Sequence, residues 1–286
     1  GAIGLASSSN ENHRGAGGIP IASRLATDEE FKTLAKVLGE YDHGVFMATF
    51  GERHSIPFLE ELCKLSGKPG FYAPHFHFAH QPDRATNIMN MAREARCRGI
   101  PVYTQGSCQP LSLTFPLDKA YILKAMRPWP STEDHAELRR IFADKSFRDA
   151  FRETLKKPDS QHVFKGRWDW VPIAVAGLEK NANLVGRTIA DIANERNQDP
   201  LDTFLDIGLE ENFGTRFTFF MLNMDESGVA ELISNDGTLI SLSDAGAHNA
   251  LLCDAGYAMH LFGHWFRDKN LFDLPTAIRK VTNDPA

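Results

Sequence analysis

Apolar residues recur at two alternating spacings along the first hundred residues of the chain. Three segments repeat apolar positions every three or four residues, as amphipathic helices do, over about residues 27–38, 55–66 and 83–98. Beside them lie three short apolar runs with the length of buried strands: Val45–Phe50, Phe71–Phe78 and Ile100–Thr104. Strands that alternate with helices over short linkers predict a parallel sheet covered by helices, which is an α/β fold.

Local signals mark the ends of the predicted helices. Thr27, followed three residues later by Glu30, forms a capping box at the start of the first helix. Gly67 and Gly99 stand directly after the second and third helices, where glycine commonly ends a helix. Pattern and end signals therefore agree on the boundaries of these elements.

The pattern is less regular in the middle of the chain. Ser107–Pro130 contains four prolines and is too apolar for a flexible linker, so we expect a long packed loop or lid there. Two charged amphipathic helices are expected at about 133–143 and 145–157, and a strand in the VPIAVAG segment. Regular alternation then returns, with elements predicted at Phe217–Leu222, Glu226–Ser234, Thr238–Ser243, Tyr257–Arg267 and Leu274–Lys280.

Composition excludes several classes of protein. The chain has 286 residues, 42% of them hydrophobic and 24% charged, which is typical of a globular protein and not of a disordered one. A net charge of −6 argues against nucleic acid or an anionic membrane as the main partner. The four cysteines form no C-x-x-C pair, as expected of buried thiols in a reducing compartment. We expect a cytoplasmic protein that binds a small-molecule substrate, and a homo-oligomer remains possible.

The segment SLSDAGAH places Asp244 directly after an apolar strand. A carboxylate where a parallel strand ends lies at the edge of the sheet where α/β enzymes have their active sites. There it could bind a divalent metal or take a proton from a metal-bound water. Asp244 could equally cap the following helix or order a glycine turn.

Histidines cluster in the run His75-Phe-His77-Phe-Ala-His80. Residues two apart on a strand share a face, so His75 and His77 would point the same way and could bind one zinc ion with a third ligand from elsewhere. Pro74 weakens a regular central strand at this point. The alternative is a set of hydrogen-bonded or partly exposed histidines at the end of a strand.

Two further groups have ambiguous chemistry. His260 and His264 have the spacing of zinc ligands on one helix face, but they lie in a segment rich in aromatic and aliphatic residues, which favours packing in the core. Glu52-Arg53-His54 follows the Val45–Phe50 strand at the edge where a site is expected, and a solvated loop explains this segment equally well.

Several segments together resemble the amidohydrolase superfamily, in its N-acyl-D-amino-acid deacylase (D-aminoacylase-like) branch. The similarity runs over nearly the whole chain and is strongest over Phe217–Ala286. The pair SDAGAH and CDAGY is the most specific part. The segments that resemble the family are GAIGLASSS, PIASRLATDEEFKTLAKVL, PVYTQGS, FFMLNMDESGVAELI, TLISLSDAGAH, CDAGY and VTNDPA.

The resemblance implies a (β/α)₈ TIM barrel that uses one or two divalent ions, usually zinc, to activate the water that hydrolyses the amide of an N-acyl-D-amino acid. Asp244 matches the family's strand-eight aspartate, a metal ligand and general base. His75 is the best match to the strand-six metal ligand, with His77 as its neighbour. Tyr103 lies where the family has a tyrosine near the substrate, and His248 of SDAGAH is a second candidate for substrate binding.

The sequence also departs from the family. The first-strand H-x-H metal pair would lie upstream of Gly1, so we expect residues 1–286 to be a single barrel portion holding about strands four to eight, with an irregular Pro- and Trp-rich insertion at about 106–170. The family's strand-five histidine is Phe50 here, and its substrate-binding arginine has no counterpart after Asp244. These departures leave open an alternative, a non-catalytic amidohydrolase-like barrel that serves as a structural or regulatory subunit.

Overall fold

The computed structural model describes residues 3–286 except 12, 14, 16–18, 125, 158–163 and 244–254. The chain forms two compact units. Unit 1 takes its described residues from Gly1–Pro110, Leu222–Ala245 and Asp254–Ala286, and unit 2 takes them from Leu111–Met221. The irregular segment expected at about 106–170 lies mostly in unit 2, which extends to Met221.

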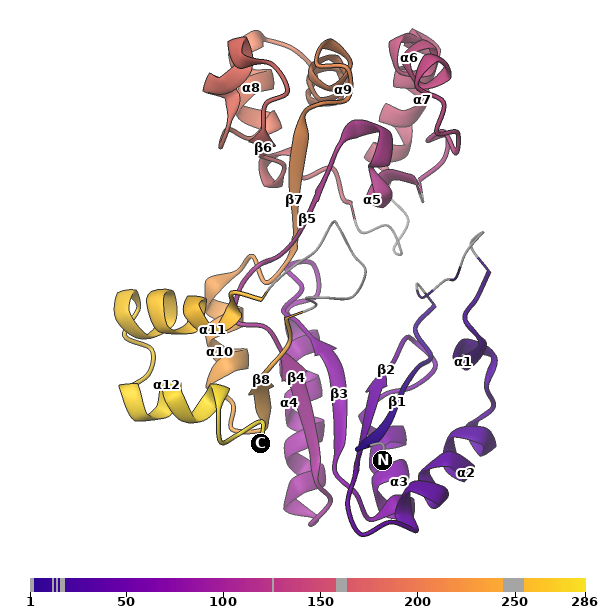
Figure 1. Cartoon of the computed structure of the whole chain (residues 1–286), viewed down its shortest axis with the longest axis vertical. Coiled ribbons are helices and arrows are strands. Elements are labelled where there is room, and N and C mark those ends of the chain that lie inside the picture. Colours follow the sequence, from indigo (N-terminus) through magenta and orange to yellow (C-terminus); the bar gives the residue numbers. More distant parts are fainter. Residues whose placement is uncertain are drawn as a thin grey trace. The chain divides into compact units, whose positions relative to one another are not determined.

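Unit 1 is built on a five-stranded sheet in which all neighbouring strands are parallel, in the order β1-β2-β3-β4-β8 (Figure 1). Because the strands are parallel, their carboxyl ends meet at one edge of the sheet. Within the described residues the sheet is open, with β1 and β8 as its outer strands. The strands are β1 (Gly4–Ser8), β2 (Val45–Thr49), β3 (Gly70–His75), β4 (Val102–Gly106) and β8 (Thr238–Ile240).

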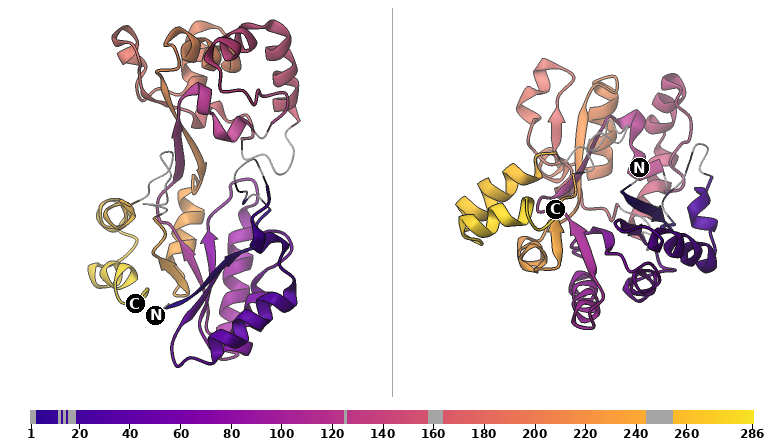
Figure 2. Two further views of the ribbon diagram at one scale, coloured as in Figure 1. Left: turned by 45° about the vertical axis from the view of Figure 1, so that its right-hand side comes forward. Right: turned by 60° about the horizontal axis from the view of Figure 1, so that its bottom comes forward.

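Helices α2, α3 and α4 cover one face of this sheet (Figure 2). Phe46 and Ala48 alternate with less buried residues along β2 and pack against Leu59 of α3 and Ala92 of α4. A second apolar cluster joins α4 to the C-terminal helices. The helices of unit 1 are α1 (Ala22–Leu25), α2 (Asp28–Gly39), α3 (Ile56–Ser66), α4 (Pro82–Cys97), α10 (Glu226–Ser234), α11 (Tyr257–His260), the π-helix η5 (Leu261–Asp268) and α12 (Leu274–Val281).

The helix-end signals in the sequence are confirmed. The Thr27 side chain accepts a hydrogen bond from the Glu30 backbone N–H at 3.2 Å, as a capping box requires. Gly67 ends α3 in the left-handed conformation, with φ of 66°, and its N–H donates to the Cys63 carbonyl. None of the described helices is long and apolar enough to cross a membrane.

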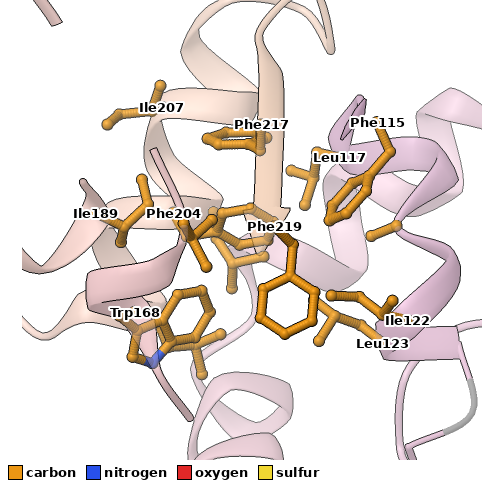
Figure 3. Packing of buried hydrophobic residues seen from close by; sticks show 14 of the residues in the cluster. Phe115, Leu117, Ile122, Leu123, Trp168, Ile189, Phe204, Ile207, Phe217 and Phe219 are labelled. Carbon is orange, nitrogen blue, oxygen red and sulfur yellow. The ribbon is translucent and has the colours of Figure 1, made fainter. Parts of the chain in front are cut away.

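Unit 2 has its own sheet, in the order β5-β7-β6, and a core dominated by aromatic side chains (Figure 3). Phe204 of α9 and Phe217 of β7 lie at its centre, with ring centroids 4.4 Å apart. Its elements are β5 (Leu111–Phe115), η2 (Leu117–Lys119), α5 (Tyr121–Lys124), α6 (His135–Ala143), α7 (Lys145–Lys156), η3 (Trp168–Trp170), β6 (Ile173–Val175), η4 (Glu179–Leu184), α8 (Ile189–Arg196), α9 (Pro200–Glu210) and β7 (Arg216–Leu222).

Two sequence expectations were wrong in detail. Ser107–Pro130 is not one long loop, because it contains β5, in which Leu111, Leu113 and Phe115 alternate as buried residues with Ser112 and Thr114. The predicted strand Phe71–Phe78 ends at His75, because its pairing with β4 shifts register between Tyr72 and His75, around Pro74. Proline has no N–H to donate to a neighbouring strand, so a ladder is interrupted where it occurs.

Candidate functional site

The carboxyl ends of β3, β4 and β8 lie together at one edge of the unit 1 sheet. His75 pairs with Gly106, and Gly106 pairs with Ile240. Beyond β8 the chain still follows β4, since the Leu242 N–H donates to the Gly106 carbonyl at 3.4 Å. The described chain therefore reaches this edge just before Asp244. Asp244 and His248 themselves lie outside the described residues.

Asn223 joins three segments at this edge. Its side-chain oxygen accepts a hydrogen bond from the His77 N–H at 2.8 Å, and its side-chain nitrogen donates to the carbonyls of Ser107 and Gln109 at 2.9 and 3.1 Å. The Asn223 N–H donates to the His77 carbonyl at 3.0 Å. Asn223 is buried and has a φ of 59°, a left-handed conformation that asparagine tolerates better than most residues. Sequence reasoning missed it, although an asparagine directly after a strand is a usable signal for such a turn.

His75 is fully buried and faces α4. Its Nε2 lies 3.2 Å from the Ala85 carbonyl, and its Nδ1 has no hydrogen-bond partner in the described structure. Burial, aided by the nearby positive charge of Arg84, lowers the pKa of His75 to about 4. The imidazole is therefore neutral at physiological pH, which is the form that binds metals.

His77 is also buried but lies beyond the end of β3. Its ring packs directly against Gly228 of α10, where a Cβ atom would come within 2.2 Å of the ring. Its Nδ1, like that of His75, has no hydrogen-bond partner in the described structure. The shared-face argument no longer applies, because the strand ends at His75. No three His, Cys, Asp or Glu side chains among the described residues come together as a metal-binding group.

Tyr103 lies in β4 on the face opposite Val102, which is buried under the helices. Its ring stacks on Phe71 with a centroid distance of 5.9 Å. The register pairs Tyr103 with Phe71 and Gly106 with His75, so Tyr103 is three residues, or about 10 Å, from the carboxyl end of the strand. Its predicted role in substrate binding stays a prediction.

A pocket of about 610 Å³ lies where β2 and β3 lead into α3 and α4. Tyr72, Ile88 and Met91 are among its apolar lining residues, and His54 and Arg84 among its polar ones. Tyr72 also contacts His75 edge to face, with centroids 6.2 Å apart, so His75 lies close behind this pocket. The Arg84 guanidinium lies 4.6 Å from the centre of the Phe78 ring.

His54 is buried, whereas Glu52 and Arg53 beside it are exposed, so the solvated-loop interpretation does not hold for His54 itself. Its Nδ1 lies 2.9 Å from Ser9 Oγ and its Nε2 lies 3.0 Å from Asp28 Oδ1, and its ring stacks on Phe58. The hydrogen bond to His54 lowers the pKa of Asp28, and Arg53 adds to this effect. The sequence did not predict this network, because Ser9, Asp28 and His54 come from three separate segments.

No family model and no curated protein sequence matches the chain. Among solved structures, an N-acyl-D-glutamate deacylase from Bordetella bronchiseptica, complexed with zinc and a phosphonate inhibitor, matches 93% of the chain with a TM-score of 0.50 and 15% identity. A D-aminoacylase with a binuclear metal centre matches 99% with a TM-score of 0.50 and 18% identity. The chain has the fold of the D-aminoacylases.

This amidohydrolase fold confirms the α/β class that the sequence predicted and the kind of barrel from which its strands are drawn. The five parallel strands equal the number expected for strands four to eight of that barrel. The chain spans only 46% and 48% of the lengths of the two D-aminoacylase-like structures. At identities of 15% and 18% this likeness establishes the fold.

Proposed function

We propose that this chain belongs to a metal-dependent amidohydrolase that removes the acyl group from N-acyl-D-amino acids. The observation that supports this most directly is the match of 93–99% of the chain to deacylase structures. The strand β8 and the residues after it reach the carboxyl edge of the sheet directly before Asp244 in the sequence, and barrel enzymes place catalytic groups at this edge. Zinc is the metal we propose, because imidazole and carboxylate ligands suit it.

The described residues fit a divalent ion in part. His75 and His77 each have a buried ring nitrogen without a partner, which is the state of a ligand awaiting a metal or a proton. We propose Asp244 as a third ligand. When bound, the ion would lower the pKa of a water and polarise the amide carbonyl. Asp244 would accept the proton from that water and pass it to the leaving amine.

Replacing Asp244 with asparagine should lower kcat for N-acetyl-D-amino acids by about 100-fold or more, because the amide cannot act as a general base. The measurement is amine release by the purified protein with zinc added. Asp236→Asn is the matched control, since Asp236 is an exposed aspartate paired only with Arg279 in the described structure. An unchanged kcat in Asp244→Asn would rule out the proposed role.

Arg84 is our candidate for binding the substrate carboxylate, since the family's arginine has no counterpart after Asp244. It lines the pocket beside His75. Arg84→Met keeps an unbranched apolar stem and removes the charged guanidinium group. We expect KM to rise about 10-fold or more, the value of one charge-assisted hydrogen bond, with little change in kcat. Arg93→Met, an exposed position on the same helix, should leave KM unchanged, and equal KM values for both variants would exclude Arg84.

A second candidate is a non-catalytic subunit with the same fold. Phe50, which replaces the family's metal-binding histidine, is buried and packs edge to face against Tyr72, His54 and Phe58. It contributes to the core and cannot bind metal. Elemental analysis of the purified protein separates the two candidates: stoichiometric zinc favours the hydrolase, and a folded protein without metal favours the subunit.

A further inference from the structure

His260 and His264 lie one turn apart where α11 continues into the π-helix η5, and their rings stack with centroids 4.8 Å apart. The sequence favoured packing of both in the core. That expectation was wrong, because both residues are only half-buried and 28% of the His264 side chain is exposed. The proposed hydrolase mechanism uses neither ring. Two histidines in contact with each other and with water can change charge near neutral pH.

This pair can carry one proton without repulsion, but not two. Glu226, the first residue of α10, places its Oε1 2.9 Å from Nε2 of His264, so a proton on His264 is stabilised by an ion pair. Figure 1 shows α10 and α11 as neighbours in unit 1. A second proton, on His260, would set two positive charges face to face across the stack. At this separation near a protein surface, such repulsion shifts an equilibrium by a factor of about 10.

His260 is the ring that resists the second proton. Its burial, and after it the neighbouring His264, lower the pKa of His260, and Glu226 offsets this only in part. His260 is therefore neutral at pH 7. Because its pKa is lower in the folded chain than the ordinary 6.5, the folded arrangement loses stability as the pH falls below 6.5.

The charged groups around the rings are already paired. Glu226 and Asp268 are the carboxylates that act on the two histidines, and Glu226 also binds the Lys269 ammonium. Against η5 pack α4, through apolar side chains such as Met89, and α12. The other pairs on these elements are Asp268 with Arg267, Arg279 with Asp236 and Asp284, and Lys280 with the Asn235 carbonyl.

The helix that carries the pair also holds the segment that follows β4. Trp265, next to His264, is buried, and its indole N–H donates to the Cys108 carbonyl at 2.6 Å. The Cys108 thiol donates to the Tyr257 carbonyl at 3.1 Å. Asn223 binds the carbonyls directly before and after Cys108. Segment 107–109 is thus held by α11 and η5 and by the same asparagine that fixes the His77 backbone.

We propose that His260 and His264 form an acid-sensitive latch on segment 107–109. With at most one proton on the two rings, the rings stay stacked and Trp265 binds the Cys108 carbonyl. A second proton separates the rings, withdraws Trp265 and loosens the segment beside the candidate active site. Residues Leu261–Asp268 form a π-helix, a rare conformation found mostly at functional sites. The latch uses none of the proposed catalytic residues, so it does not depend on the proposed hydrolase function.

The test is heteronuclear NMR of the purified chain, titrated from about pH 7.5 to about pH 5, the range in which histidines change charge. The chain has four tryptophans, and three of them lie in unit 2. The variant Trp265→Phe identifies the indole N–H signal of Trp265. We expect its protection from hydrogen exchange, relative to free tryptophan at the same pH, to fall about 10-fold in acid. The midpoint should lie below 6.5, and the other three indole signals should keep their protection.

A matched pair of variants assigns the effect. His260→Phe keeps a stacking ring that cannot take a proton, so Trp265 should stay equally protected at both ends of the titration. His43→Ala, at an exposed histidine elsewhere in unit 1, should behave as the unaltered chain does. Constant protection of Trp265 in the unaltered chain would overturn the proposal. An equal fall in His260→Phe would also overturn it, because another group, such as the buried His75, would then be responsible.

The histidine ring signals of the unaltered chain give a result that requires no variant at the pair. We expect His260 and His264 to titrate in two coupled steps, with the second step at the pH where Trp265 loses protection. Two rings that titrate independently of each other would contradict the latch.

Discussion

Glu211→Ala is expected to unfold unit 2 in a large fraction of molecules. The buried Glu211 carboxylate accepts four hydrogen bonds, from the backbone N–H groups of Gly177 and Leu178 and from the side chains of Asn181 and Thr215. Alanine leaves all four donors without a partner, and we expect a loss of about 5 kcal/mol in the free energy of unfolding. Domains have stabilities of only about 5–15 kcal/mol, so this one change removes much of the total.

Tryptophan fluorescence during urea unfolding measures this effect, because Trp129, Trp168 and Trp170 all lie in unit 2. Glu211→Gln should lose about half as much, since the amide retains one acceptor oxygen. The adjacent Glu210 is the matched control. It forms only a surface ion pair with Lys180 in the described structure, so Glu210→Ala should change stability by less than about 1 kcal/mol. Equal losses at both positions would refute the buried-network explanation.

The same network predicts how unit 2 responds to acid. Burial alone would raise the pKa of Glu211, but the hydrogen bonds from Thr215, Gly177 and Asn181 outweigh it and hold the pKa below 4.5. The stabilisation is therefore complete above pH 4.5 and is lost as the pH falls through the lowered pKa. In Glu211→Gln this contribution to the acid sensitivity of unit 2 should disappear.

Asn223→Ala is the second large effect that we expect, and it concerns the candidate active site. The change removes the acceptor of the His77 N–H and the donors to the Ser107 and Gln109 carbonyls, of which the first two contacts are buried and the third is part-buried. It also forces alanine into a left-handed conformation. Together these should cost about 4 kcal/mol of unfolding free energy. Hydrogen exchange of the His77 amide measures the local loosening at the carboxyl end of β3.

Two further variants separate the causes. Asn223→Gly removes the hydrogen bonds but suits the backbone, so it should lose about 3 kcal/mol. Asn270 has a φ of 52° at an exposed position, so Asn270→Ala should show the strain alone, about 1 kcal/mol. An Asn223→Ala protein no less stable than Asn270→Ala would show that the hydrogen bonds contribute nothing.

Sequence patterns predicted those parts of the fold that depend on local spacing. The helices α2, α3 and α4 and the strands β2 and β4 are found within one or two residues of their predicted ends. The predictions of strands were wrong where prolines interrupt the pattern of apolar and polar residues. Pro110 and Pro116 concealed β5, although the strict alternation of apolar and polar residues in its sequence LSLTF is the pattern of a strand. Pro74 shortened β3, so the two-residue period could not be carried on to His77.

The candidate site was harder to predict, because its contacts join residues far apart in sequence. His75 was found from its place near the end of an apolar run. Asn223 lies 146 residues from His77, and His54 lies 45 residues from Ser9. Nothing in local spacing identifies such pairs. Asp244 and His248 lie outside the described residues, so their roles stay predictions.

The contact between Asn223 and Gln109 has a consequence for how the chain folds. Thr104 of β4 and Thr238 of β8 pair across 134 residues of sequence, and closing so long a loop in a disordered chain is slow. Suppose that unit 2 folds first and that Asn223 then forms its hydrogen bond with Gln109. The chain segments directly before and after unit 2 are then held together, and only the segment 223–238 separates β8 from its partner strand β4. Unit 2 is then, in kinetic terms, a folded spacer that brings two distant strands within reach of each other.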